Sequence, residues 1–244
     1  MKSVSSQISR FLLMVFLFAA GVAAERTGLL AYVFDPYEYP IILRLLGEHL
    51  YLVAISMVLA TAIGLSLGII LTRKRFKKFA GVCLYIVGLG QTIPSLAVIA
   101  LAVSFFGIGP IPAIFALTIY SILPLARNTL AGIIAVPPPL IDAARGMGLP
   151  PRRILREVEL PNAMKVILTG FRVALVINIG TAALASLIGA GGLGDLIFSG
   201  ISLMEPDTLL AGAIPVTLMA LIADFLCDLG GLILIPRGLR LAEQ

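Results

Sequence analysis

Residues 79–126, FAGVCLYIVGLGQTIPSLAVIALAVSFFGIGPIPAIFALTIYSILPLA, contain no charged side chain. A helix needs about 20 apolar residues to cross the hydrocarbon core of a bilayer, so this stretch is too long for a single span. Glycine and proline gather at residues 107–112, GIGPIP, and predict a loop there. The stretch therefore predicts two membrane-spanning helices.

Three further stretches are long and apolar enough to span a membrane. Residues 50–72 and 173–194 carry no charge, and residues 208–236 carry only Asp224 and Asp228. With 59% hydrophobic and 13% charged residues and a mean hydropathy of +1.07, the chain cannot cover a water-soluble surface. The sequence predicts an all-α integral membrane protein with five core spans in a transmembrane domain over residues 49–240.

Residues 1–48 form a separate N-terminal unit in this interpretation. The run from Phe11 to Ala24 follows two basic residues and ends in small residues before Glu25 and Arg26, as a secretory signal does. The alternative, which we favour, is a short sixth helix at the N-terminus. In both cases the remainder, to residue 48, is expected outside.

The basic residues predict the orientation. Sixteen of the 18 lysines and arginines lie in residues 1–10, 73–78, 127–172 and 237–244, which alternate with the predicted outside segments. Because short loops rich in lysine and arginine stay in the cytoplasm, these segments are assigned inside a bacterial inner membrane. The net charge of +5 is then a topology signal, and no nucleic-acid partner is expected.

The longest cytoplasmic segment is predicted to be folded. Three prolines at 137–139 end the preceding helix, and residues 141–147 favour a short helix with Asp142 in its first turn. Gly148 is a candidate for the C-cap of this helix. Residues 152–158 predict a second short helix that ends before Leu160. An amphipathic loop lying on lipid headgroups is the alternative.

The same segment resembles the EAA loop of binding-protein-dependent ABC importer permeases. Asp142-Ala143-Ala144, then Gly148, then Val158-Glu159-Leu160-Pro161 follow the spacing of that loop, with Asp142 in place of Glu and Val158 in place of Ile. The resemblance implies the type I ABC importer permease fold and a coupling helix, within residues 137–161, that docks on the ATPase. The residues it assigns to ATPase coupling are Asp142, Ala143, Ala144, Arg145, Gly148, Leu160 and Pro161.

Three other stretches resemble the permeases of osmoprotectant importers for glycine betaine, choline and carnitine. They are QTIPSLA at 91–97, LPLARNT at 123–129 and LIGAGGLGDLI at 187–197, and the resemblance covers residues 45–240. Permeases of methionine importers are the nearest alternative. The implied partners are a dimer of ABC ATPase subunits, a second permease (a copy or a paralogue), a periplasmic or lipid-anchored substrate-binding protein and membrane lipids.

The chain itself is not expected to be an enzyme. It contains no G-x-x-x-x-G-K-[ST] sequence, so ATP and magnesium belong to the partner ATPase. Neither a catalytic group nor a metal site is expected, because the two cysteines are far apart and lack ligand-like neighbours. Gly189–Gly194 satisfies G-x-G-x-x-G, but it follows a membrane-length helix rather than a strand and is not a dinucleotide site.

Polar residues inside the spans are candidates for the translocation path. Pro94 should break its helix near mid-membrane, where broken helices often form transport sites, although a simple kink is the alternative. The expected path carries no fixed positive charge at mid-membrane. Its candidate residues are Gln91, Thr92, Pro94, Ser95, Asn178 and Thr181. For Asn178 and Thr181 the alternative is helix packing, which we favour for Thr181 and not for Asn178.

Two acids in the last span need a separate explanation. Asp224 and Asp228 lie four residues apart and share one face of a helix. Carboxylates at this depth are costly, so we expect a structural or gating role with Arg127 or Arg172 as partner. A proton relay, which would make the chain an ion-coupled secondary transporter, is the alternative.

Small residues recur every four positions in the first core span. Ser56, Ala60, Gly64 and Gly68 predict a seam of close helix packing, within one chain or between two permeases. His49, the only histidine, is expected at the outer interface.

Overall fold

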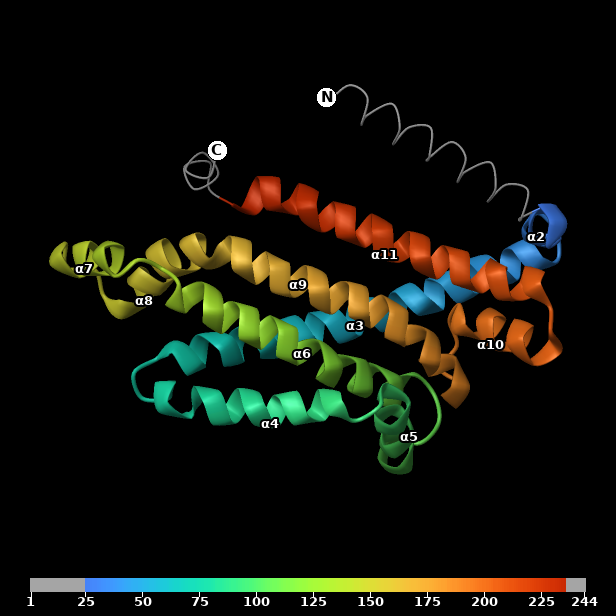
Figure 1. Ribbon diagram of the computed structural model, residues 1–244, viewed down its shortest axis with the longest axis horizontal. Helices are drawn as coiled ribbons and strands as arrows, with labels where there is room; N and C mark the ends of the chain where they lie inside the picture. The colour runs from blue at the N-terminus through green and yellow to red at the C-terminus, as the bar shows by residue number, and fades with distance from the viewer. Residues whose placement is uncertain (1–24, 236–244) are drawn as a thin grey trace, which may run out of the picture.

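The computed structural model describes residues 25–235, apart from the side chain of Lys77, and this part of the chain is helical with no strand. Figure 1 shows helices α2 to α11, with a 3₁₀ turn before α4, a π-helical turn before α9 and a 3₁₀ turn after it. Their bounds are α2 Leu29–Val33, α3 Glu38–Thr72, α4 Ala80–Thr92, α5 Ser95–Phe106, α6 Pro110–Ile134, α7 Pro138–Gly146, α8 Pro151–Ile154, α9 Leu160–Ala182, α10 Gly194–Leu203 and α11 Pro206–Leu234, and the turns are Lys77–Phe79, Leu155–Glu159 and Ala183–Ile188.

Four stretches are long and apolar enough to cross a membrane. They are Glu38–Thr72, Pro110–Ile134, Pro151–Ile188 and Pro206–Leu234; α4 and α5 are a bent pair that makes a fifth if the two count as one span. With that pair counted as one span, the number agrees with the five predicted core spans. The expected N-terminal helix or signal-like segment over residues 1–24 lies outside the described residues.

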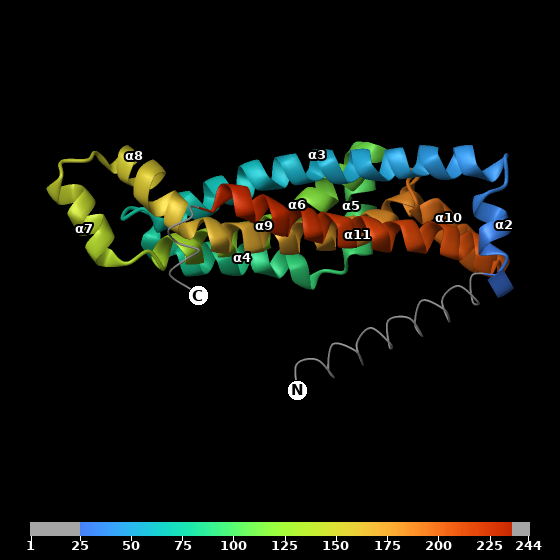
Figure 2. The same cartoon turned by 90° about the horizontal axis from the view of Figure 1, so that it is seen from above.

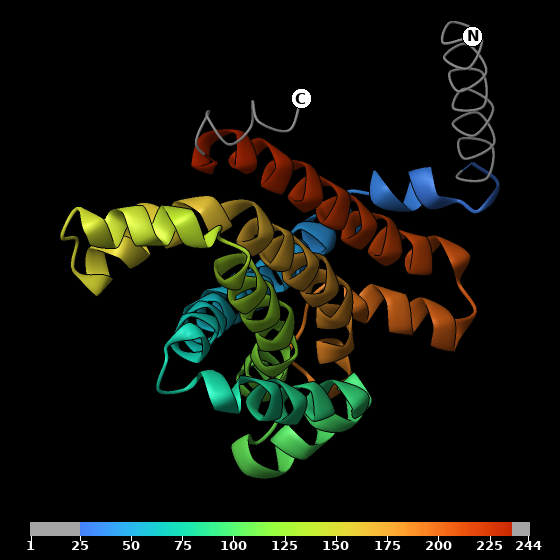
Figure 3. The same ribbon diagram turned by 60° about the vertical axis from the view of Figure 1, so that its left-hand side comes forward.

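The long helices lie side by side and leave two distinct ends (Figures 1 and 2). At one end, called here the α7 end, α7 and α8 project beyond the bundle. At the other, the α10 end, α2 and α10 pack against α11. Seen from the side in Figure 3, α11 lies on the outside of α9, and α4 and α5 lie on the opposite side of α6.

Helix α3 is longer than the uncharged run predicts. It begins at Glu38 rather than near residue 50, and it includes Arg44 and Glu48, which form an ion pair at 2.8 Å one turn apart on the helix surface. The expected boundary between residues 48 and 49 thus falls inside a continuous helix.

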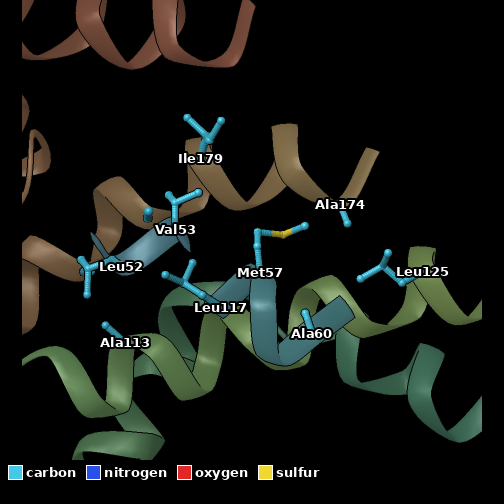
Figure 4. Packing of buried hydrophobic residues seen from close by; sticks show 11 residues of the cluster. Leu52, Val53, Met57, Ala60, Ala113, Leu117, Leu125, Ala174 and Ile179 are labelled. Carbon is cyan, nitrogen blue, oxygen red and sulfur yellow. The ribbon is translucent and has the colours of Figure 1, made fainter. Parts of the chain in front are cut away.

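The small-residue stripe is the seam between α3 and α6. A Cβ atom on Gly64 would lie 2.6 Å from the Cβ of Leu125, and one on Gly68 would lie 2.5 Å from the Cβ of Thr129. The packing is too close for any side chain, so the seam within one chain is confirmed. Figure 4 shows the adjoining apolar core, in which Met57 of α3 lies among residues of α6 and α9.

The stretch 79–126 contributes to three helices, because the first of its two predicted spans is broken at Pro94, as the sequence predicts. The expected loop is present, since α6 begins at Pro110, but the preceding span is broken between Thr92 and Ser95. Ile93 and Pro94 have extended backbone, as a residue before proline prefers, and α4 and α5 meet at 93°.

Candidate functional site: the coupling loop and the polar path

Helix α7 ends in a backbone turn that requires glycine. Gly148 has φ +76°, its N–H donates to the carbonyl of Arg145, and the N–H of Leu149 donates to that of Ala144. These two bonds form a Schellman motif and satisfy carbonyls at the end of the helix. The sequence-based assignment of Gly148 to the end of this helix is confirmed.

Two details of this loop differ from the sequence-based prediction. Helix α7 starts at Pro138, whose missing N–H is not needed in a first turn, so Asp142 lies in the middle of the helix and pairs with Arg145 at 3.1 Å. The second short helix does not end before Leu160. A π-helical turn accommodates Pro161 within the first turn of α9, and the chain is helical from Pro151 to Ala182.

The predicted coupling residues differ in exposure. Asp142, Ala143, Arg145 and Gly148 are exposed on the projecting loop, whereas Ala144 is buried. Leu160 and Pro161 are half-buried where the loop joins the bundle. A cavity of about 870 Å³ separates α7 from the ends of α3 and α6, and Arg73 and Glu159 line it as an ion pair at 2.5 Å. The exposed part of α7 is thus a surface available to a partner.

Pro94 interrupts the helix beside the other predicted path residues. Gln91 donates its amide N–H to the carbonyl of Tyr120 at 2.8 Å, and the Tyr120 hydroxyl donates to the carbonyl of Ile93. Thr92 donates to the carbonyl of Leu89 within its own helix, and Ser95 begins α5. The break is therefore held to α6 by polar contacts in both directions.

A cavity of about 330 Å³ opens beside this break. Arg127 of α6 lines it together with Gln91 and Thr92. The sequence placed Arg127 at the start of the inner segment and expected an uncharged path, but α6 continues to Ile134 and the guanidinium of Arg127 approaches Gly88 of α4. The cavity beside the predicted path residues is thus lined by one positively charged side chain, which the prediction of an uncharged path did not include.

Asn178 lies in the core of the bundle. Its side chain is 1% exposed; it accepts a hydrogen bond from the Ser56 hydroxyl at 3.1 Å and donates to Ser121 at 2.8 Å. These bonds join α3, α6 and α9. Thr181 is half-exposed and donates to the carbonyl of Ile177. A role for either residue in the path stays a prediction; in this conformation Asn178 holds helices together.

Asp224 and Asp228 share one arginine. Arg172 of α9 forms hydrogen-bonded ion pairs with both carboxylates of α11, and its Nη1 lies 2.5 Å from Asp228 Oδ1. Arg172 was one of the two partners that the sequence predicted. Paired carboxylates join two spans, which favours the structural interpretation of these acids.

At the α10 end, a loop between α9 and α10 is fixed by residues of α3. The Glu48 carboxylate accepts the Gly192 N–H at 3.0 Å, and a Cβ on Gly191 would lie 2.2 Å from Glu48 Oε2. His49 is fully buried, not interfacial as expected, and its Nε2 donates to the carbonyl of Ile179 at 3.0 Å. Sequence reasoning missed the contact of Glu48 with the loop at Gly191 and Gly192. The glycine run at 189–194 was the available signal, because glycine allows such a close approach.

Asp195 follows this loop in the first turn of α10. Burial raises the pKa of its carboxyl above the usual value. The nearby charge of Glu48 raises the pKa further, while Arg44 lowers it. The α10 end therefore holds an acid, Asp195, whose ionisation is disfavoured by its surroundings.

Comparisons with known proteins agree with this architecture. The chain is 50% identical to the osmoprotectant import permease protein OsmY of Salmonella typhimurium over 74% of this chain and 77% of OsmY. It is 42% identical to the glycine betaine/carnitine/choline transport system permease protein OpuCB of Bacillus subtilis over 80% of this chain and 88% of OpuCB. In fold it is similar to a chain of the MetNI methionine ABC transporter in an inward facing conformation, with a TM-score of 0.74 and 22% identity over 83% of this chain and 100% of that one.

The family model for "Binding-protein-dependent transport system inner membrane component" matches residues 64–237. This range includes the broken span, the projecting helices α7 and α8, and α11. The apolar spans and these relatives together place the protein in the inner membrane as a multi-pass component of a transport system rather than as an enzyme. The chain belongs to the family of binding-protein-dependent transport system inner membrane components.

Proposed function

We propose that this protein forms the membrane path of an ATP-driven importer for osmoprotectants such as glycine betaine, carnitine and choline. The observation that carries the proposal is identity of 42–50% to permeases of such solutes over three quarters of the chain. The likeness to a methionine transporter lies at 22% identity and concerns the fold, so methionine is the less favoured solute.

Membership of the family implies that the protein works with an ABC ATPase, a substrate-binding protein and a second permease. We assign the α7 end to the cytoplasm and α7 to the contact with the ATPase. The support is that α7 projects from the bundle with Asp142 and Arg145 exposed, and that the basic residues within 73–78 and 145–156 then lie on the cytoplasmic side.

The packing of α7 against the start of the next helical stretch supports a route for coupling. The turn at Gly148 separates α7 from α8, but α7 packs against α8 and the π-helical turn, and from Pro151 the chain is helical to Ala182. A displacement of α7 would therefore pass to α9 through these contacts. The ion pairs of Arg172 with Asp224 and Asp228 connect α9 to α11. The hydrogen bonds of Asn178 to Ser56 and Ser121 connect α9 to α3 and α6, so all three helices would follow the movement of α9. ATP binding and hydrolysis in the partner would thereby open and close the path.

Uptake of labelled solutes tests this proposal. The permease is expressed with its cognate ATPase and binding protein in a strain that lacks its other osmoprotectant and methionine importers. Uptake of glycine betaine, carnitine or choline is expected, with little uptake of methionine. Uptake of methionine alone would overturn the solute class. Uptake that persists with an ATPase unable to hydrolyse ATP would overturn the ATP-driven mechanism.

A further inference from the structure

The cavity beside the broken helix contains a positive charge without a counter-ion in the described part of the chain. Arg127 forms neither an ion pair nor a hydrogen bond among residues 25–235, in contrast to Arg73 and Arg172, which are both paired with acids. An arginine inside a membrane span is costly when it faces lipid, and such residues mark ion or substrate pathways.

The Arg127 side chain is exposed, and its guanidinium lies against α4. Its Nη2 lies beside Gly88, 3.3 Å from where a Cβ on that residue would be. Gly88 is eight residues into α4, or about 12 Å from the start of the helix. A glycine in the middle of a helix costs about 1 kcal/mol relative to alanine, and here it leaves room for the arginine side chain.

The other walls of the cavity fit a small zwitterion. Gln91 and Thr92 offer polar groups, and Tyr85, which is 66% exposed, offers an aromatic ring. An aromatic ring attracts a quaternary ammonium group, whereas a guanidinium binds a carboxylate. A volume of about 330 Å³ lies at the lower end of the range for small-molecule sites.

We propose that Arg127 binds the carboxylate of the transported solute in this cavity, with Tyr85 beside the ammonium group. The proposal rests on the function proposed above. It makes the path distinguish solutes: glycine betaine and carnitine carry a carboxylate, and choline does not. Arg127 would then favour zwitterions over a solute that is only a cation.

The test compares uptake of glycine betaine, carnitine and choline by the complete transporter carrying Arg127→Gln, Arg127→Lys or Arg75→Gln. Arg75 is exposed outside the cavity, so its variant controls for the loss of one arginine charge. Arg127→Gln is expected to lower uptake of glycine betaine and carnitine about tenfold, the size of one charge-assisted hydrogen bond, and to change choline uptake less than about threefold. Arg127→Lys is expected to keep part of the zwitterion uptake.

A second pair of variants leaves the charge in place. Gly88→Leu fills the space of the guanidinium, while Gly81→Leu adds the same side chain on α4 where nothing lies within 4 Å. Gly88→Leu is expected to lower zwitterion uptake selectively, and Gly81→Leu to leave the ratio of solutes unchanged.

Several outcomes would overturn the proposal. Equal loss of all three solutes in Arg127→Gln would assign Arg127 to folding, to a lipid phosphate or to an acid of a second permease, and no loss would leave it without a role. Wild-type uptake of choline alone would also overturn it. If the wild type imports glycine betaine and carnitine but not choline, equal zwitterion uptake by Arg127→Gln and Arg127→Lys would contradict carboxylate binding by Arg127. A wild type that imports none of the three solutes contradicts the proposed function itself.

Discussion

Arg73 Nη2 lies 2.5 Å from Glu159 Oε2, and this ion pair joins the end of α3 to the π-helical turn that leads into α9. The Glu159 side chain is 12% exposed and the Arg73 side chain 35% exposed, so the acid depends on its partner more than the arginine does. The pair fixes the base of the projecting α7–α8 segment to the bundle.

Removing either partner should destabilise the protein unequally. Arg73→Gln leaves a nearly buried carboxylate without its cation and is expected to lower the melting temperature in detergent more than Glu159→Gln does. The double variant should lose no more stability than Arg73→Gln alone. The coupling energy between the two side chains then equals the loss caused by Glu159→Gln, about 1 kcal/mol. Strictly additive losses would mean that the two side chains do not interact in solution.

Gly148 should be sensitive to substitution through its backbone alone. A Cβ there meets nothing within 4 Å, but φ is +76°, so Gly148→Ala is expected to cost about 1–2 kcal/mol in the local turn and to lower the solute transported per ATP hydrolysed. Gly146→Ala is the matched control, since Gly146 is helical and also has open space. If both variants transport the same amount of solute per ATP hydrolysed, the turn at Gly148 is not needed for coupling.

Asp195 should make stability depend on pH. Its pKa in the folded protein lies above the usual value of 3.8, so its protonated form stabilises the fold, and this stabilisation is lost as the pH rises through the folded pKa. The melting temperature of the wild type minus that of Asp195→Asn is therefore expected to fall as the pH rises from about 4. Glu48→Gln should shift this fall to lower pH, because it removes a charge that raises the pKa. A difference that rises with pH would contradict the account.

Substitution of Asn178 tests whether this residue only packs helices or also lines the transport path. Asn178→Ala removes bonds to Ser56 and Ser121 and is expected to cost about 1–3 kcal/mol of stability, while Thr181→Ala, at a half-exposed site, should cost less than about 0.5 kcal/mol. If Asn178 only joins helices, the ratio of glycine betaine to choline uptake stays as in the wild type. A changed ratio would place its amide on the path.

The sequence predicts the spans well because lipid imposes a simple rule on length and charge. The uncharged runs give five spans, and the stripe from Ser56 to Gly68 marks a real packing seam. The start of α3 could not be predicted, because Arg44 and Glu48 look like the edge of a span although they continue its helix. Helix ends that carry charge are therefore the weak point of counting uncharged residues.

The site was less predictable because it depends on which helices meet. Gln91 and Asn178 are both polar residues of spans, yet one lines a cavity and the other is buried between three helices. Nothing in the sequence places Arg127 against Gly88, since the contact joins α6 to α4. Pro94 was informative because proline breaks a helix in any surroundings.

We propose that this permease imports an osmoprotectant only when a partner ATPase hydrolyses ATP. The most direct measurement is accumulation of labelled glycine betaine in liposomes that contain the permease and its ATPase, with the binding protein outside and ATP inside. We predict accumulation against a gradient that stops when ATP is omitted or the ATPase cannot hydrolyse it. Equal accumulation without ATP, or none with every component present for betaine, carnitine and choline alike, would contradict the account.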